Sequence, residues 1–498
     1  MTRGAKAAAL AVLLCACSVT RHEDLSVPMA PGSFRHAAPA SGAQALDSGW
    51  PAMFGDPALA RLVAKALEQN LDIKQANARI DLARAAVTAS RADLMPSIDA
   101  GGGYSRSRVS GTVDNALPKR TMRTWAVAAD VSYTVDWTGA LRGEAAAAES
   151  NAVAAEADAD AAKLRVATEV AADYLTVHYV DEDIAALERN VALRETALKL
   201  VEARAQVGRS SDLDVLRART EWQTTRAELT ESRRLRENLV DAMAALLGQS
   251  AASFVLTGAS SAETAPALAP ATATATAPAT ALAMPAVPVG LPADVLARRP
   301  DLYAAGRRLD AAAWTVGVAR TAWLPQLTLT ADGGFASRSL ADFLERNSSL
   351  WGLAASVALP FFDGGRRDAA LASAQARYVL AEASYRSVAY DALREVQDAL
   401  NDIAAERERI AAYDDAVATS DQVASLSRRR YALGYVDYFE VVDSDRDALS
   451  IERDAIHARQ ALAVATVGLV RALGGGWSAP ARAGVAEADA ASARPTSQ

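Results

Sequence analysis

The feature of this sequence that most constrains the fold is a helix-to-strand transition that occurs twice. The stretches SRADLMPSIDAGGGYS, from Ser90, and RTAWLPQLTLTADGGF, from Arg320, each leave a helical run, pass a proline and enter alternating residues. Proline ends a helix because it lacks an N–H group and clashes with the preceding turn. Each stretch therefore predicts a helix that leads directly into a β-strand.

The similarity between the two stretches extends over most of the chain. The aligned positions include Pro96 and Pro325, Gly139 and Gly364, Gly208 and Gly434, and Gly248 and Gly474. Chance similarity between two alanine-rich helices does not explain several matched blocks in one order at nearly constant spacing. The sequence therefore predicts a tandem duplication, with a first repeat over residues 56–248 and a second over residues 291–474.

Within each repeat, long helices are predicted on both sides of a short β-hairpin. The first helix starts at Asp56 and Pro57, a capping residue followed by a proline, and is expected to run unbroken for about 38 residues. After the hairpins, the runs 140–207 and 366–433 are long enough to reach about 100 Å each. A glycine then turns the chain into a second helix of about 36 residues.

The predicted hairpins, residues 97–136 and 326–361, alternate apolar residues with small or polar ones. The clearest apolar face consists of Trp125, Val127, Ala129, Val131, Tyr133 and Val135. Four such strands of about ten residues, with tryptophans near their ends, are typical of an outer-membrane barrel. A soluble antiparallel sheet packed on a core would alternate in the same way. Four strands cannot close a barrel around a water-filled lumen, so several chains would have to combine their strands.

The N-terminus has the features of a lipoprotein signal peptide, residues 1–16. Two basic residues precede an apolar run that is too short to span a bilayer. The stretch Leu14-Cys15-Ala16-Cys17 resembles a bacterial lipobox, which predicts cleavage before Cys17 and attachment of lipid, including palmitate, to that residue. Ser18 in the next position implies sorting to the outer membrane. An ordinary cleaved signal peptide that happens to hold cysteines is the alternative.

Three further segments lie outside the two repeats. Residues 17–55 are expected to form a lipid-anchored N-terminal segment. Residues 249–290 are rich in alanine, proline and threonine, a composition that favours an extended linker over a packed core. Residues 475–498 are predicted to be a disordered tail.

The composition argues against an enzyme and against a nucleic-acid-binding protein. A formal net charge of −8 disfavours contact with phosphate groups. The four histidines are widely spread, and neither a glycine-rich phosphate loop nor a nucleophile elbow is present in the sequence. We therefore expect no catalytic residue, no metal site and no cofactor other than the covalent lipid on Cys17.

Two further motifs carry a family resemblance, GLPADVLARRPDL from Gly290 and LPFFDGGRR from Leu359. Together with the lipobox and the paired glycine turns, they resemble the TolC family. The nearest group is the NodT/OprM-like outer-membrane lipoproteins of tripartite RND-type efflux systems. The resemblance covers about residues 50–477 and implies a mixed α + β-barrel membrane protein. In that fold a homotrimer forms a 12-stranded outer-membrane barrel, four strands per protomer, continued by a long α-helical periplasmic barrel.

The function implied by the resemblance is that of a passive exit duct in the cell outer membrane. Drugs or other small molecules would pass through it from a periplasmic membrane-fusion adaptor and an inner-membrane RND-type pump. The turns between the long helices would dock the adaptor. The residues of these turns are Val207, Gly208, Arg209, Leu433, Gly434 and Tyr435.

The resemblance also implies a periplasmic gate near the second turn. Its acidic residues are expected six and nine positions after the turn glycine, at Glu440 and Asp443. Tyr431 corresponds to a tyrosine that holds the gate shut by bonding to an acid such as Asp214. Val436 stands where the family has an arginine, so that part of the gate departs from the pattern.

Two other functions are compatible with parts of the sequence. A type I secretion duct would share the whole architecture and differ only in its pump. A lipid-anchored periplasmic coiled-coil protein, structural or adaptor, would account for the helices and the lipobox. It would leave the two alternating hairpins unexplained.

Overall fold

The structure is a computed structural model that describes residues 33–35, 46–47, 49–110, 112, 121–256, 284–285, 287–289 and 292–479. The signal peptide, Cys17, most of the linker and nearly all of the tail lie outside these residues. The chain divides into two compact units. Of the described residues, the first unit contains those within 78–156 and 304–387, and the second contains the others.

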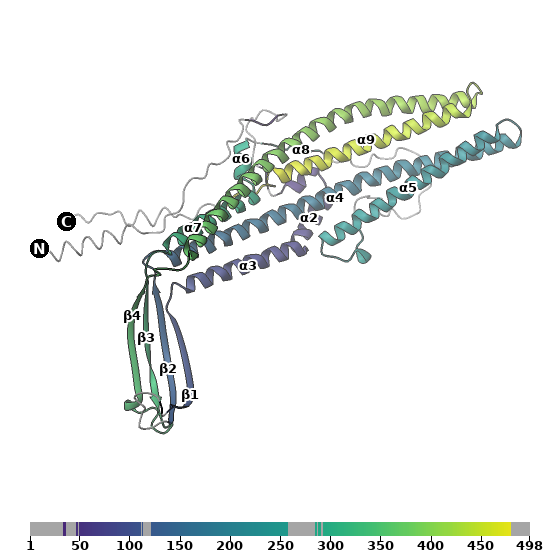
Figure 1. Ribbon diagram of the computed structural model, residues 1–498. Helices are drawn as coiled ribbons and strands as arrows, with labels where there is room; N and C mark the ends of the chain where they lie inside the picture. Colours follow the sequence, from purple (N-terminus) through teal and green to yellow (C-terminus); the bar gives the residue numbers. More distant parts are fainter. Residues whose placement is uncertain are drawn as a thin grey trace. The chain divides into compact units, whose positions relative to one another are not determined.

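The order of the elements repeats along the chain (Figure 1). The first half has α2 (Pro57–Gln69), α3 (Leu71–Ala92), β1 (Ser97–Arg108), β2 (Thr121–Val135), α4 (Ala140–Gln206) and α5 (Asp212–Leu246). The second has α6 (Pro292–Ala297), α7 (Pro300–Thr321), β3 (Gln326–Ser337), β4 (Ser349–Ala358), α8 (Arg366–Ala432) and α9 (Tyr438–Ala472). Short 3₁₀ turns lie at Trp50–Phe54, Ala251–Ser253 and Arg346–Ser348. The long helices have 67 residues in both halves, and those that follow them have 35.

The expectation of one unbroken helix after Asp56 is wrong, because the chain breaks at Asn70. There the backbone leaves the helical region, with ψ at 136°. The Asn70 side-chain oxygen accepts hydrogen bonds from the N–H groups of Asp72, at 2.8 Å, and Ile73, at 3.2 Å. Its amide nitrogen donates to the Leu246 carbonyl at 2.8 Å. Asn70 thus caps α3 and ties the break to the end of α5.

The four strands form one antiparallel sheet in the order β1-β2-β3-β4, drawn side by side in Figure 1. The predicted alternation is present, since the apolar residues of neighbouring strands meet on one face, as in the pairs Ile98–Val131 and Leu327–Val357. Among the residues that the structure describes, no strand pairs with the outer edge of β1 or of β4. Among the helices of the described residues, none is both long and apolar enough to cross a bilayer.

A charged side chain caps each helix that leaves the sheet. Asp136 accepts from Arg142 Nε at 3.0 Å, and Asp363 accepts from Arg367 Nε at 2.7 Å. Both carboxylates also accept backbone N–H groups at the start of the helix that follows. The aspartate and the last arginine of the FDGGRR motif therefore act together as a helix cap. The aspartate satisfies N–H groups that have no partner within the helix.

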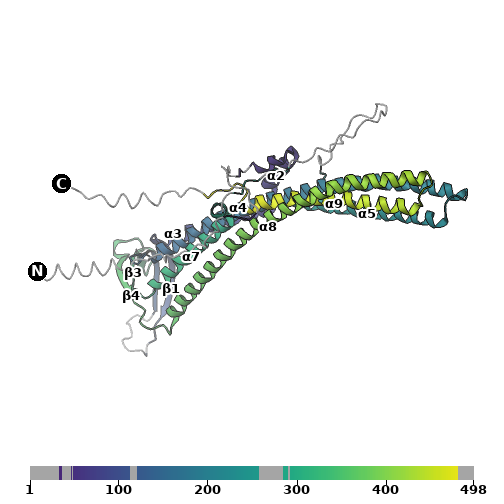
Figure 2. The same cartoon turned by 90° about the horizontal axis from the view of Figure 1, so that it is seen from above.

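The second unit contains two helical hairpins, α4 with α5 and α8 with α9. Figures 1 and 2 show them side by side, with the turns of both hairpins at the same end. Their largest core cluster includes Tyr174, Leu175, Met243 and Leu247, all fully buried. The hydroxyl group of Tyr174 donates to Asp56 Oδ2 at 2.5 Å, which links α4 to the residue that caps α2.

The carboxylate of Asp173, on α4, is predicted to lower the free energy of unfolding at neutral pH. Burial, together with the nearby charge of Glu169, raises the pKa of Asp173 to about 6. The folded chain therefore holds this proton more tightly than the unfolded chain, and stability is lost as the pH rises from about 4 through 6. Allowing for solvent screening, we expect Asp173→Asn to stabilise the protein by about 1 kcal/mol at pH 7.5.

Thermal unfolding at several pH values tests this prediction. The gain from Asp173→Asn should shrink to nothing as the pH falls to about 4, where aspartate is itself protonated. Asp241→Asn, at an exposed site on α5, is the control and should change little at either pH. A gain that is the same at both pH values would show that the charge of Asp173 is not its cause.

Candidate functional site: the turns of the helical hairpins

Both hairpin turns use a glycine in the left-handed region of backbone conformation. The φ angles are +73° at Gly208 and +82° at Gly434. In each turn the N–H of the glycine and the N–H of the next residue donate to carbonyls in the last turn of the helix. The second of these bonds runs from Arg209 to the Arg204 carbonyl at 2.8 Å in the first turn and from Tyr435 to the Arg430 carbonyl at 2.9 Å in the second. This is the hydrogen-bond pattern of a Schellman cap, in which glycine avoids the penalty that a Cβ atom would carry.

The tips of the hairpins expose large apolar side chains. The exposed fractions are 69% for Val207, 71% for Leu433 and 74% for Tyr435. The turns occupy the sequence positions expected for docking and present apolar surface there. Exposed apolar groups gathered at the end of a rigid helical hairpin are suited to contact with another protein.

Asp214 forms part of the N-terminal cap of α5 in the described chain. It lies in the first turn of α5, where Ser211 is the N-cap. Its carboxylate accepts from the Ser211 hydroxyl at 2.8 Å, the Ser211 N–H at 3.1 Å and the Ser210 hydroxyl at 3.2 Å. Burial opposes the shift, but these hydrogen bonds and Arg217 lower the pKa of Asp214. Asp214 and Ser211 thus form a capping box, and no hydrogen bond joins Asp214 to Tyr431 within the described part of the chain.

Tyr431 instead connects the two hairpins. The Arg204 guanidinium, from the end of α4, lies over its ring with 4.7 Å between Cζ and the ring centroid. On the other side, the rings of Tyr431 and Tyr438 are 5.4 Å apart. Both belong to a small apolar cluster at this end of the hairpins, which also includes Leu198, Val201, Ala218, Val441 and Val442. The guanidinium of Arg204 therefore makes a cation–π contact with Tyr431. In this chain the position at which the resemblance expects an arginine, 436, is valine.

Glu440 and Asp443 lie in the first two turns of α9. Glu440 pairs with Arg430 at 3.3 Å and accepts from the Ser427 hydroxyl at 3.4 Å. Asp443 is exposed, and Arg446 lies near enough to interact with its charge. The structure thus places both acids close to the second turn, on one helix and one turn of helix apart.

A chain of ion pairs that the sequence did not predict joins the two hairpins. Glu221 of α5 pairs with Arg194 of α4 at 2.8 Å and also with Arg446 of α9. Further along, Arg453 of α9 pairs with Asp183 at 2.7 Å and with Glu228 at 3.0 Å. Arg194, Glu221 and Asp183 have mostly buried side chains, so these pairs are less screened than surface pairs. No local sequence motif predicts these ion pairs, because each pair forms only where two particular helices pack against each other.

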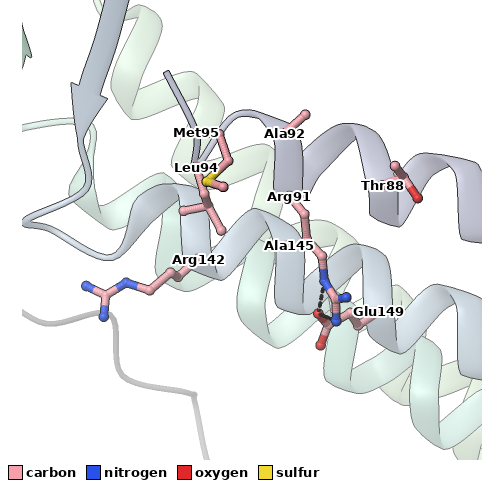
Figure 3. Close-up of a pocket in the computed structure, with 8 residues that line it drawn as sticks. All are labelled: Thr88, Arg91, Ala92, Leu94, Met95, Arg142, Ala145 and Glu149. Carbon is pink, nitrogen blue, oxygen red and sulfur yellow. Dashed lines mark hydrogen bonds and ion pairs between the residues drawn. The ribbon is translucent and has the colours of Figure 1, made fainter. Parts of the chain in front are cut away.

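A hollow lies between α3 and α4, next to the start of β1 (Figure 3). Its volume is about 590 Å³, and its lining combines apolar Leu94 and Met95 with an ion pair between Arg91 and Glu149. At the matching place in the second repeat stands the larger Trp323, with Arg367 over its ring at 5.8 Å. The hollow thus follows from a smaller side chain in the first repeat, and its charges are already paired.

No group of three or more potential metal ligands occurs among the residues that the structure describes. The arrangement at the turns holds the two hairpins together and presents exposed apolar side chains that can contact another protein. The paired charges on α4, α5 and α9 favour one relative position of the hairpins within the second unit.

Comparison with known proteins identifies the family of this chain. The model of the family described as "Outer membrane efflux protein" matches residues 62–249 and 291–475, one match to each half of the chain. The chain belongs to this family. It is a channel protein of the outer membrane, with a helical extension in the periplasm.

Two curated relatives are similar to this chain over most of its length. Outer membrane protein OprJ of Pseudomonas aeruginosa is 29% identical over 476 residues, which is 95% of this chain and 96% of OprJ. The toluene efflux pump outer membrane protein TtgF of Pseudomonas putida is 29% identical over 428 residues, 86% of this chain and 85% of TtgF. Both are named as outer-membrane proteins, and TtgF as part of an efflux pump.

Solved structures agree in fold over the same extent. The outer-membrane channel OprN superposes with a TM-score of 0.81 at 26% identity, covering 92% of this chain and 99% of OprN. The open state of the MtrE outer membrane channel of Neisseria gonorrhoeae superposes with a TM-score of 0.78 at 25% identity, covering 92% and 98%. The TolC-like fold expected from the sequence is therefore confirmed, and the reading as a periplasmic coiled-coil protein is set aside.

Proposed function

We propose that three copies of this chain form the outer-membrane exit duct of a tripartite efflux pump. The observation that carries this proposal is a four-stranded sheet whose two outer edges pair with no strand in the described part of the chain. In a membrane such edges would leave unsatisfied backbone groups, which is too costly in a medium without water. Three sheets closed edge to edge give a 12-stranded barrel, wide enough for a water-filled lumen.

The same threefold assembly continues the duct through the helices. Each chain supplies two helical hairpins, α4–α5 and α8–α9, and six hairpins around an axis make a tube. Nothing in such a duct transforms its cargo, so drugs and other small molecules would pass by diffusion. Choice of cargo would rest with the pump.

The partners of the duct are a periplasmic membrane-fusion adaptor and an inner-membrane RND-type pump. The exposed apolar turns at Val207, Leu433 and Tyr435 support this part of the proposal, because they offer six docking tips per trimer. Names of relatives that are components of efflux pumps, such as TtgF, point the same way. A lipid on Cys17 would tether residues 17–55 to the outer membrane, and residues 249–290 would connect the two repeats.

The gate of the duct is proposed at the same end as the tips. In a trimer Glu440 and Asp443 occur three times each, and rings of acids favour cations. Tyr431 would help to hold the gate closed through its contacts with Arg204 and Tyr438. Asp214 would act indirectly, by fixing the start of α5 behind the first turn.

Replacing the two gate acids by their amides is expected to weaken the cation preference of the channel. Glu440→Gln combined with Asp443→Asn removes six negative charges from the trimer without changing side-chain size. The permeability ratio of K⁺ to Cl⁻, measured from reversal potentials in planar bilayers under a salt gradient, should fall severalfold. Asp415→Asn, at an exposed site of α8, serves as the control. An unchanged ratio would remove both acids from the pore lining.

The proposed function is tested most directly in cells and in membranes together. Deleting the gene should raise the accumulation of a fluorescent efflux substrate, and expressing the chain with its pump should restore export. Purified protein should migrate as a trimer in detergent and give discrete single-channel steps. A monomeric protein that does not insert in bilayers would contradict the proposal.

A further inference from the structure

The two faces of the sheet carry charges of opposite sign. Successive residues of a strand point to opposite faces, so Arg106 and Arg108 share the apolar face with Tyr104. By the same alternation, Arg123 shares that face with Trp125. The aspartates of the strands are on the small, polar face, at Asp99, Asp130 and Asp332. In the four described strands, the arginines are therefore found on the face that a barrel would turn towards lipid.

An aromatic pair marks the outer border of the apolar face. Tyr104 and Trp125 are direct partners in the register of β1 and β2, and their ring centroids are 4.5 Å apart. From Val135, at the end of β2 that joins the helices, to Trp125 the strand spans about 34 Å, since each residue rises about 3.4 Å. At a tilt of about 40° this span has a height of about 26 Å, which matches the lipid-facing band of about 25 Å in outer-membrane barrels.

Two arginines follow the aromatic pair on the same face. Arg106 and Arg123 are direct partners in the register, so their Cβ atoms are about 5 Å apart. We call these two residues the arginine pair. Each is two residues further from the helices than an aromatic residue of the border, which is a distance of about 7 Å along the strand. The arginine pair therefore lies beyond the hydrocarbon, at the level of the headgroups of the outer leaflet.

The arginine pair has no counter-ion among the residues that the structure describes. At the other end of the sheet the arginines are neutralised within the chain, because Arg142 pairs with Asp136 at 3.0 Å and Arg367 with Asp363 at 2.7 Å. Like charges that are directly opposed on neighbouring strands destabilise the sheet. An anion bound from outside the chain would remove this repulsion.

The second repeat shows that the strand pairing does not need these charges. When the two hairpins are aligned at the first pair of each, the positions equivalent to Arg106 and Arg123 are Phe335 and Ser349. Phe335 and Ser349 are likewise direct partners, and neither is charged. The arginine pair is therefore a property of the first hairpin, and the fold alone does not account for it.

We propose that the arginine pair binds the phosphate groups of an outer-leaflet glycolipid of the lipid A class. Guanidinium groups form charge-assisted, bidentate hydrogen bonds with phosphate. Lipid A carries phosphates on a sugar headgroup above acyl chains, so one molecule offers anions to the arginine pair and hydrocarbon to the apolar face below it. Arg108, further out on the same face, adds a third cation. The inference rests on the proposed barrel, which turns the apolar face towards lipid, and adds a lipid site to it.

Binding of purified lipid A to the full-length protein in uncharged detergent tests this site. Native mass spectrometry gives the apparent affinity for diphosphoryl lipid A, which Arg106→Gln combined with Arg123→Gln should weaken by about tenfold or more. The matched control is Arg338→Gln combined with Arg346→Gln, which removes two exposed arginines of the β3–β4 loop at the same end of the sheet. The control should change the affinity by less than about twofold.

Two other probes identify the chemistry of the ligand. Monophosphoryl lipid A, which lacks one phosphate, should bind the unchanged protein about fivefold more weakly than the diphosphoryl form. Inorganic phosphate in large molar excess should not displace lipid A, because it has no acyl chains to contact the apolar face. Displacement by inorganic phosphate would overturn the assignment to a lipid.

Thermal unfolding gives a second readout in which the sign of the effect changes. Without lipid A, the double glutamine variant should unfold at a slightly higher temperature than the unchanged protein, because the repulsion is gone. With lipid A the order should reverse, since a ligand that binds the folded state stabilises it. If the double variant does not assemble, each single variant, Arg106→Gln or Arg123→Gln, should lose about fivefold in affinity.

Two results would overturn the site. One is equal binding of diphosphoryl lipid A by the double glutamine variant and the unchanged protein, and the other is an equal loss in the control. Failure of the proposed function is a separate result, because an unchanged protein that gives no discrete channel steps in bilayers of uncharged lipid would contradict the duct itself.

Discussion

Replacing Gly474 by alanine is expected to lower the free energy of unfolding by about 3 kcal/mol or more, the range of severe core defects. Gly474 has a φ angle of +85°, and an added Cβ atom would lie 2.1 Å from the Arg298 carbonyl oxygen. That oxygen belongs to the backbone just before α7, so it cannot move away as a flexible side chain would. The substitution should separate the end of α9 from the start of α7.

The matched control is Gly434→Ala at the hairpin turn. Its φ angle of +82° is nearly the same, but no atom lies within 4 Å of the position that a Cβ would take. Only backbone strain remains there, worth about 1–2 kcal/mol. Thermal unfolding of both variants in detergent separates the two effects. Equal losses would show that the close approach at Gly474 is relieved at little cost.

The first repeat contains a weaker version of the same contact. At Gly248 a Cβ would lie 2.8 Å from the carbonyl oxygen of Gln69, the residue equivalent to Arg298. Both repeats therefore end their last helix against the backbone of the same helix junction. Gly248→Ala is expected to cost less than Gly474→Ala, because the shift needed to clear the contact is smaller.

Replacing Arg299 by methionine is expected to cost about 2 kcal/mol, less than the loss of one partner from a fully buried ion pair, because water reaches the two carboxylates that remain. The Arg299 side chain is only 9% exposed. It bonds to Asp301 at 2.6 Å, to Glu395 at 2.7 Å and to the Ala472 carbonyl at 3.2 Å. Methionine keeps most of the packing volume but leaves two carboxylates without their cation. Arg299 is the second arginine of the RRPDL motif, and its hydrogen bonds connect α7 to α8 and α9.

Two comparisons make the Arg299 prediction specific. Arg298→Met, at the neighbouring and less buried arginine, should cost under about 1 kcal/mol, as surface substitutions do. The pH dependence should also change. Burial opposes the shift, but the hydrogen bonds and charge of Arg299 lower the pKa of Asp301, so its contribution is present above about pH 4 and lost on acidification. The loss caused by Arg299→Met should therefore shrink in acid, and a constant loss would point to packing alone.

Much of the secondary structure could be predicted because its signals are local. The absence of glycine and proline over 366–433 predicted α8 to within a residue of its observed end, and alternation predicted both hairpins. The break at Asn70 could not be predicted in this way. Asparagine is tolerated inside a helix, and it acts as a cap here because its amide also reaches the Leu246 carbonyl on a distant helix.

The candidate site was likewise predicted only in part from the sequence. The turn glycines Gly208 and Gly434 and the two acids after the second turn were found from their positions in the sequence. The partner of Tyr431 was not, because Arg204 lies more than two hundred residues earlier. The bond expected between Asp214 and that tyrosine stays a prediction, and within the described residues the Asp214 carboxylate accepts from the hydroxyl groups of Ser210 and Ser211.

The sequence by itself determined the duplication, the long helices and the alternating hairpins, and with them the family. Those features arise from backbone preferences and from side-chain periodicity, which act over a few residues. Only the tertiary structure decided which charges meet between the hairpins, which glycines touch backbone and how the strands are registered. These depend on contacts between residues hundreds of positions apart, and such contacts exist only after the helices and strands have packed.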